Sequence, residues 1–218
     1  MIAIAAVLKE RVPALRLGCI ACRVVVEPSS DDLWSLIEDQ CGILEKSVQL
    51  DQINSLPVIR ASRIAYKACG KDPARYRLSA EALIRRVVKE KSLYRINNVV
   101  DLLNLVSIAY GFSIGGYDSD AIQGDIVMGL GEANEPYIGI GRGALNIENL
   151  PVFRDKMGPF GTPTSDSERT AVGVNTRRFL MVLIGFGAND TLQAACNHSV
   201  ELLKRYASAT HFEINFID

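Results

Sequence analysis

The sequence predicts an α+β fold in a single domain, residues 1–218, with helices concentrated in the first half. These helices are expected to pack on a glycine-rich, largely antiparallel sheet in the second half. Amphipathic helical patterns with polar caps dominate the chain up to Phe112, and short alternating apolar runs separated by glycines dominate it afterwards. No repeat, linker or low-complexity stretch divides it, so one domain is the economical interpretation.

Composition excludes several classes of protein. Hydrophobic residues make up 48% and charged residues 22% of the chain, as in a packed soluble domain. The first residues lack the basic segment of a signal peptide, and no apolar run reaches the roughly 20 residues of a membrane helix. Five cysteines, an odd number without an export signal, predict reduced thiols and a cytoplasmic protein. We expect no membrane association, no cofactor and no metal, and interpret the Cys19-x-x-Cys22 pair as strand packing.

In the first half, capping residues and apolar spacing place the elements. Residues 17–27 are rich in Val, Ile and Cys and predict a strand that ends at Pro28. Ser29 or Ser30 should cap the next helix, and residues 59–68 predict another. Asp72-Pro73 is typical of a helix start, after which Ser79 restarts or continues the helix.

In the second half, strands alternate with turns. Residues 93–112 form a last strongly apolar helix, and Gly115-Gly116 predicts a turn into a strand. Residues 122–130, 137–141 and 178–187 suit strands, and the last of these is apolar enough for the centre of a sheet. A helix from Asp190 or Thr191 to about Tyr206 and a strand at 212–217 complete the chain.

Residues 59–95 are strongly basic although the whole chain has a net charge of −1. This segment carries seven arginines and four lysines, Lys91 among them, against three acidic residues, a local net charge of +8. Such segregation is typical of polyanion binding, and arginine favours bidentate phosphate contacts. The alternative is a solvated helix face.

Polar side chains also interrupt the apolar helix at 93–112. Asn98, Asp101 and Asn104 step by three residues and fall close to one face. Because buried polar groups need partners, they either cap neighbouring loops or line a pocket. Residues 165–170 (SDSERT) follow a rigid Pro/Gly loop and form either a solvent turn or part of such a pocket.

Four segments together resemble a known family: DPARYRLSAEALIRR, LYRINNVVDLLNLVSI, IGGYDSDAIQGDI and SDSERT. They resemble the tRNA-editing domain of the bacterial phenylalanyl-tRNA synthetase beta subunit in a stand-alone form, most strongly over residues 57–187. The resemblance implies hydrolysis of mischarged aminoacyl-tRNA. It also implies that the protein is not a ligase on its own, because the catalytic core of the synthetase is missing.

The resemblance also implies site residues. Asn104 matches a pocket asparagine, Tyr117-Asp118 an aromatic-Asp pair, and residues 158–161 a glycine-rich loop. Two positions differ, because Leu103 replaces a threonine and Gly115 a histidine, so the pocket should be less polar. The complete candidate pocket comprises Asn98, Asp101, Asn104, Gly115, Gly116, Tyr117, Asp118, Gly158, Gly161, Ser165, Asp166, Ser167 and Thr170. The candidate tRNA-binding residues are Arg75, Arg77, Arg85, Arg86, Lys89, Arg95 and Arg169.

Three functions remain open from sequence. One is a trans-editing hydrolase that uses water attack, since no nucleophile elbow or adjacent Cys–His pair occurs in the chain. The second is a non-catalytic tRNA- or RNA-binding module, and the third an amino-acid-binding protein that has lost editing. In the first two, the expected partner is tRNA or aminoacyl-tRNA.

Overall fold

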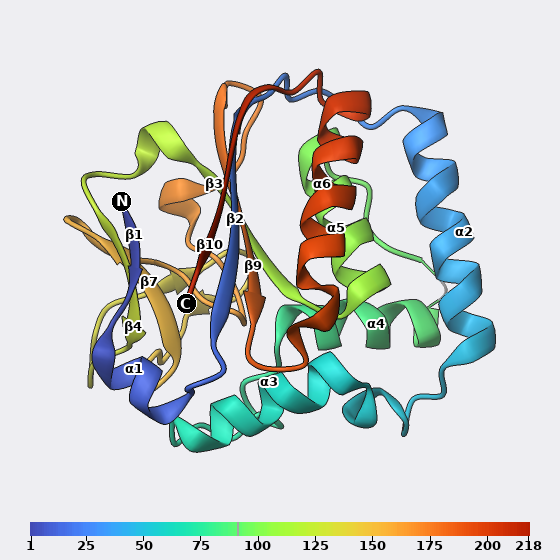
Figure 1. The fold of residues 1–218 in the computed structure, drawn as a ribbon. Helices are drawn as coiled ribbons and strands as arrows, with labels where there is room; N and C mark the ends of the chain where they lie inside the picture. Colours follow the sequence, from blue (N-terminus) through green and yellow to red (C-terminus); the bar gives the residue numbers. More distant parts are fainter. Residues whose placement is uncertain (91) are drawn as a thin grey trace.

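A computed structural model describes residues 1–90 and 92–218 and arranges them in three layers (Figure 1). The middle layer is a four-stranded antiparallel sheet of β2 (Arg16–Arg23), β3 (Ser113–Asp118), β9 (Arg178–Gly185) and β10 (Thr210–Ile217), in the order β10-β2-β9-β3. One face is covered by α2 (Asp31–Ser47), α4 (Ser79–Glu90), α5 (Asn98–Tyr110) and α6 (Leu192–Tyr206). The predicted α+β class is confirmed.

A second sheet covers the opposite face (Figure 1). It contains β1 (Ile2–Ile4), β4 (Ile126–Leu130), β7 (Pro151–Asp155) and β8 (Gly158–Gly161), in the order β1-β4-β7-β8, with only the β1–β4 pair parallel. A short hairpin of β5 (Ile138–Gly139) and β6 (Gly143–Ala144), with α1 (Ala6–Arg11) and α3 (Pro57–Ala68), completes the main elements. Strands β1, β6 and β7 and helix α1 were missed from sequence. The glycine-rich loop expected at residues 158–161 is wrong, because these residues pair with β7 as strand β8.

The central sheet is buried on both faces because its strands alternate between two cores. In β9, Phe179, Met181 and Leu183 pack with the helices, whereas Leu180, Val182 and Ile184 face the second sheet. Each large apolar side chain buried in this way contributes about 1.5–3 kcal/mol. A strand buried on both sides therefore reads as a continuous apolar run, which is how the sequence predicted its central position.

The helix boundaries follow local chemistry. The Ser30 side chain accepts a hydrogen bond from the Leu33 amide and caps α2, and Asn97 caps α5 in the same way. Gly111, with φ 82°, ends α5 in the left-handed conformation. The expected helix start at Asp72 is wrong, because the Asp72 carboxylate caps only a single turn and α4 begins at Ser79.

Gly115 and Gly116 lie inside β3, paired with Val182 and Met181 of β9, so the predicted turn at these residues is also wrong. Glycine is required here for space. A Cβ at Gly115 would collide with the Tyr117 hydroxyl, and one at Gly116 would lie 2.7 Å from Leu103 Cδ1. The two glycines let α5 and a tyrosine approach the sheet closely.

All five cysteines are buried free thiols, as predicted. Cys19 and Cys22 are three residues apart on β2, so they point into opposite cores. In the part of the chain that is described, no helix is long and apolar enough to cross a membrane.

Candidate functional site

A cavity of about 300 Å³ opens between α5, the edge strand β3 and the loop that follows β8. Four of the predicted pocket residues line it, namely Asn104, Gly116, Ser165 and Asp166. Most of the remaining wall is apolar and includes Val100, Leu103, Ile114, Ile140, Val172 and Phe179. The cavity therefore combines a hydrophobic lining with a few converging polar groups, which is the usual form of a small-molecule site.

Asp166 is held in one orientation by its neighbours. The Tyr117 hydroxyl donates a hydrogen bond of 2.9 Å to Asp166 Oδ1. Burial raises the pKa of Asp166 to about 7, while hydrogen bonds from Tyr117 and from the backbone amides of Gly116 and Thr162 act in the opposite direction. A carboxylate with such a pKa exchanges a proton readily near neutral pH.

The Asn104 side chain, unlike that of Asp166, is not held by hydrogen bonds within the described residues. It lies in the middle of α5, half-buried, and its side-chain amide has no hydrogen-bond partner among the described residues. Because Asn104 lines the cavity, its donor and acceptor are available to a ligand there.

Tyr117 occupies the space that side chains at two glycines would need. Its hydroxyl lies against both Gly115 and Gly161, and a Cβ at either position would collide with it. The ring is buried and packs edge-on against Phe160 at 5.0 Å between centroids. A histidine at position 115, as the resemblance implied, is therefore sterically incompatible with Tyr117 in this chain.

Thr162 is a lining residue that the sequence analysis missed. Its hydroxyl donates to the Ser165 carbonyl and accepts from the amides of Thr164 and Ser165, which shapes the loop that carries Asp166. The Thr-Pro-Thr-Ser pattern is typical of a Ser/Thr turn and is the signal that identifies it.

Asn98 and Asp101 do not line the cavity. The Asn98 amide donates to the carbonyls of Val25 and Tyr206 and so ties α5 to the ends of β2 and α6. Asp101 is buried and accepts from the Ser29 hydroxyl and the Ile96 amide. Both are capping groups, the alternative left open from sequence.

Four further candidates also lie outside the cavity. Asp118 accepts from the Thr176 hydroxyl at 2.8 Å, and Ser167 caps the short 3-10 helix Glu168–Thr170. Thr170 is buried, and Gly158 is the first residue of β8. None of the four lines the cavity, and among the described residues the buried Thr170 hydroxyl has no hydrogen-bond partner.

Most of the predicted RNA-binding cations are engaged within the protein. The buried Glu81 carboxylate pairs with Arg63 at 2.8 Å, Arg85 at 2.9 Å and Arg77 at 3.6 Å. The other engaged arginines are Arg86 with Glu90, Arg95 with Asp31, and Arg169 with Asp155. Arg75 and Lys89 are exposed, and Lys91 lies outside the described residues.

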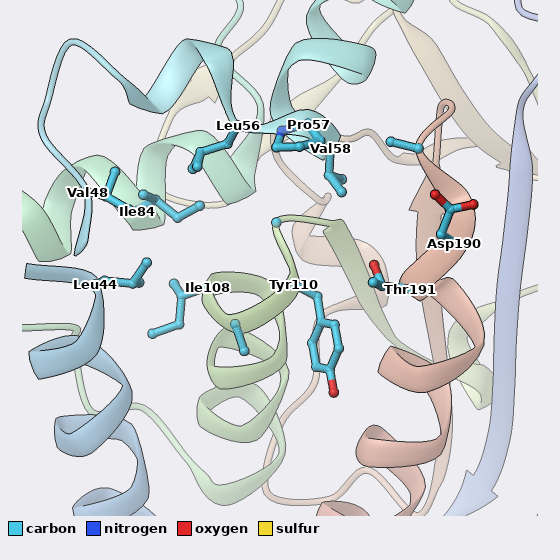
Figure 2. A pocket seen from close by; sticks show the side chains of 13 residues that line it. Leu44, Val48, Leu56, Pro57, Val58, Ile84, Ile108, Tyr110, Asp190 and Thr191 are labelled. Atoms are coloured by element: carbon cyan, nitrogen blue, oxygen red, sulfur yellow. The ribbon is translucent and has the colours of Figure 1, made fainter.

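A second cavity, of about 400 Å³, lies between α2, α3, α4 and α5, beside the turn that precedes α6 (Figure 2). Leu44, Leu56, Val58, Ile84 and Ile108 turn their apolar side chains toward one another there, with Asp190 and Thr191 at one side. No predicted site residue lines it. In contrast to the first cavity, it has few polar groups that converge on a common point.

Within the described residues, no three His, Cys, Asp or Glu side chains are grouped closely enough to hold a metal ion. The polar groups that line the first cavity include the carboxylate of Asp166 and the amide of Asn104.

Comparison with known proteins identifies the family of the sequence. An N-terminal fragment of the phenylalanyl-tRNA synthetase beta-subunit from Pyrococcus horikoshii aligns with the whole chain at 13% identity and a TM-score of 0.49. The chain spans half the length of that fragment. No curated protein matches. The family model of the B3/4 domain matches residues 61–208, most of the chain, including α5, β3 and the Asp166 loop. The chain therefore belongs to the B3/4 domain family, which is related to the phenylalanyl-tRNA synthetase beta subunit.

Proposed function

We propose that this protein recognises aminoacyl-tRNA and hydrolyses the ester of mischarged tRNA in trans. The observation that carries the proposal is the cavity in which the unpartnered amide of Asn104 and the half-buried carboxylate of Asp166 both line one apolar space. Membership in the B3/4 family supports a tRNA-related substrate.

The reaction asks little of protein side chains, because an aminoacyl ester is already activated. In the proposed mechanism Asp166 accepts a proton from a water molecule whose oxygen attacks the ester carbonyl carbon. The Asn104 amide donates to the carbonyl oxygen as negative charge develops on it. The tetrahedral intermediate then expels the ribose oxygen, which takes the proton from Asp166. The products are the free amino acid and the tRNA hydroxyl.

Tyr117 is a positioning residue in this scheme. Its hydroxyl holds Asp166 Oδ1 in place and favours the ionised form of that carboxylate, the form that accepts a proton. Because the ring is locked between Gly115, Gly161 and Phe160, the hydrogen bond is preorganised before substrate arrives.

The apolar wall predicts the substrate range. Val100, Leu103 and Phe179 face the space that the amino-acid side chain would fill. Hydrophobic pockets discriminate by only about 1–3 kcal/mol per methylene-sized change. We therefore expect broad, weak selectivity with a preference for large apolar aminoacyl groups.

The test is deacylation of a panel of aminoacyl-tRNAs by the unmodified protein and by Asp166→Asn. Removing a general base lowers rates by about 10²–10⁴-fold, whereas tRNA affinity should stay within about twofold because phosphate contacts dominate it. Glu168→Gln, an exposed carboxylate in the same loop, is the matched control and should leave the rate unchanged.

Two outcomes separate the alternatives. If no aminoacyl-tRNA in the panel is deacylated but tRNA still binds, the non-catalytic RNA-binding module is the correct function. If neither occurs while free amino acids bind, the protein is an amino-acid-binding protein.

A further inference from the structure

A third concave surface lies at the end of the central sheet, where β2 finishes and β9 and β10 begin. This cleft has a volume of about 410 Å³. Three arginines line it, Arg23, Arg177 and Arg178, together with the hydroxyl side chains of Ser208 and Thr210. One acidic residue, Asp120, also lines it. None of these residues belongs to the basic segment at 59–95.

Two of these arginines stand opposite each other in the sheet. Arg23 and Arg178 are direct cross-strand partners in the β2–β9 ladder, so their side chains leave the same face of the sheet side by side. Like charges placed opposite one another in this way destabilise a sheet. An anion bound between the two guanidinium groups reduces that repulsion.

The ion pairs available to the cleft are few. Arg178 makes a pair of 3.2 Å with Asp120, in which both side chains are more than half exposed. Arg177 donates to the backbone carbonyls of Val174 and Thr176. Among the described residues, neither Arg23 nor Arg177 has a carboxylate within 4 Å, although Glu213 lines an adjoining hollow with Arg23 and Arg178. The cleft itself keeps an excess of positive charge.

The backbone beside the cleft is irregular. Ser208 and His211, which are not glycines, have φ values of 47° and 57°. The pairing of β10 with β2 shifts register between Thr210 and Glu213. Such bulges re-aim side chains at the margins of sheets, and here the bulge lies beside Thr210, which lines the cleft.

The cleft lies close to the cavity that contains Asp166. Gly116 lines that cavity and pairs with Met181, and Arg178 stands three residues before Met181 in β9. At about 3.4 Å per residue the separation along the strand is roughly 10 Å. Side chains three residues apart leave opposite faces of a strand, so Arg178 lies on the face of β9 opposite to Met181. An RNA strand whose end enters the cavity reaches the cleft by passing round the end of the sheet, where β9 begins.

We propose that the cleft formed by Arg23, Arg177 and Arg178 binds phosphodiesters of the single-stranded 3′ end of tRNA. This inference rests on the proposed function for the identity of the RNA. Arginine is suited to the role because its planar fork donates two hydrogen bonds to one phosphate. The site reads the backbone and positions the strand, without base specificity.

The test measures tRNA binding by fluorescence anisotropy as salt is varied, with the unmodified protein and with Arg23→Ala/Arg178→Ala. Loss of two phosphate contacts should flatten the slope of log K against log salt by about 1.4, because each contact contributes about 0.7 for a single strand. Lys46→Ala, an exposed cation at the end of α2, is the control and should leave the slope unchanged. Removing the like-charge pair should not lower the melting temperature, which checks that the variant is folded.

A second arm uses tRNA whose single-stranded 3′ end has been trimmed. The difference between the unmodified protein and the double variant should vanish with this RNA. An unchanged salt slope with intact tRNA overturns the proposal, and so does an equal loss of affinity for intact and trimmed tRNA. If inorganic phosphate occupies the cleft while tRNA binding ignores the arginines, the site takes small anions and the proposal also fails.

The failure of this inference is distinguishable from failure of the proposed function. If the protein deacylates tRNA but its tRNA binding does not depend on Arg23 and Arg178, the proposed role of the cleft is refuted and the proposed hydrolase activity stands. If tRNA binding depends on these arginines but no substrate is deacylated, the proposed role of the cleft stands and the proposed hydrolase activity is refuted.

Discussion

Replacing Tyr117 by Phe removes one hydroxyl and tests whether Asp166 is held as a proton acceptor. The hydroxyl donates a 2.9 Å hydrogen bond to Asp166 Oδ1, and the ring is buried. A hydrogen bond to a charged group contributes about 1.5–3 kcal/mol, so Tyr117→Phe should lower the free energy of unfolding by about 2 kcal/mol. For a chain of this size that corresponds to a fall of about 4–8 °C in melting temperature.

The same substitution should change the titration of Asp166. The Tyr117 hydrogen bond favours the ionised carboxylate, and its loss raises the pKa of Asp166 further above its present value of about 7. Because the proposed mechanism needs the ionised form, the acidic limb of the pH–rate profile should move to higher pH. The measurements are thermal unfolding, the pH dependence of deacylation, and ¹³C NMR titration of the aspartate carboxyl groups.

Tyr66→Phe is the matched control. Tyr66 is equally buried, and its hydroxyl shares a 2.9 Å hydrogen bond with the neutral Thr164 hydroxyl. Losing it should cost about 1 kcal/mol and leave the pH–rate profile in place. If the two variants lose equal stability and neither moves the Asp166 titration, the reasoning about the Tyr117–Asp166 pair is refuted.

Asn104→Ala should abolish deacylation while tRNA affinity stays within about twofold; equal loss of both in filter-binding and deacylation assays would mean that Asn104 maintains the fold. Asp166 has a pKa above that of an unfolded aspartate, so its contribution to stability is present below about pH 4 and is lost as pH rises toward 7. Asp166→Asn removes this pH dependence. The melting temperature of the variant minus that of the unmodified protein should therefore increase from pH 5 to pH 8, and a difference that stays constant would contradict the raised pKa. Glu81→Gln should lower the free energy of unfolding by about 2–3 kcal/mol, because it leaves three arginines around a buried neutral group, whereas Glu90→Gln in a half-exposed pair should cost under about 1 kcal/mol. The five buried cysteines should resist alkylation until the chain unfolds and then all react, since burial raises the pKa of three of them, Cys19, Cys22 and Cys196, to about 12; rapid modification of the folded protein would contradict their burial.

The positions of most helices and of the central strand follow from local sequence. Ser30 caps α2 through an atom three residues away, so local capping chemistry was sufficient to place its start. The helix expected at 93–112 starts only at Asn98, because Asn97 caps α5, and it ends at Gly111. The central position of strand β9 was predictable because burial on both faces requires an unbroken apolar run. The missed strands β1 and β7 are short, and their pairing depends on distant segments rather than on their own residues.

The candidate site divides in the same way. Asn98, Asp101 and Asn104 look alike in sequence, three polar residues on one apolar helix, and only the tertiary structure separates them. Asn98 and Asp101 form hydrogen bonds with the segment between β2 and α2 and with the end of α6. Asn104 instead lines the cavity that α5 forms with β3 and the loop that carries Asp166. The basic segment shows the same limit: its charge was evident from composition, but a single buried carboxylate, Glu81, engages three of its arginines. The sequence alone determined which residues carry polar and charged groups. The tertiary structure decided which of those groups lack a partner within the protein, because folding brings together residues that are far apart in the sequence.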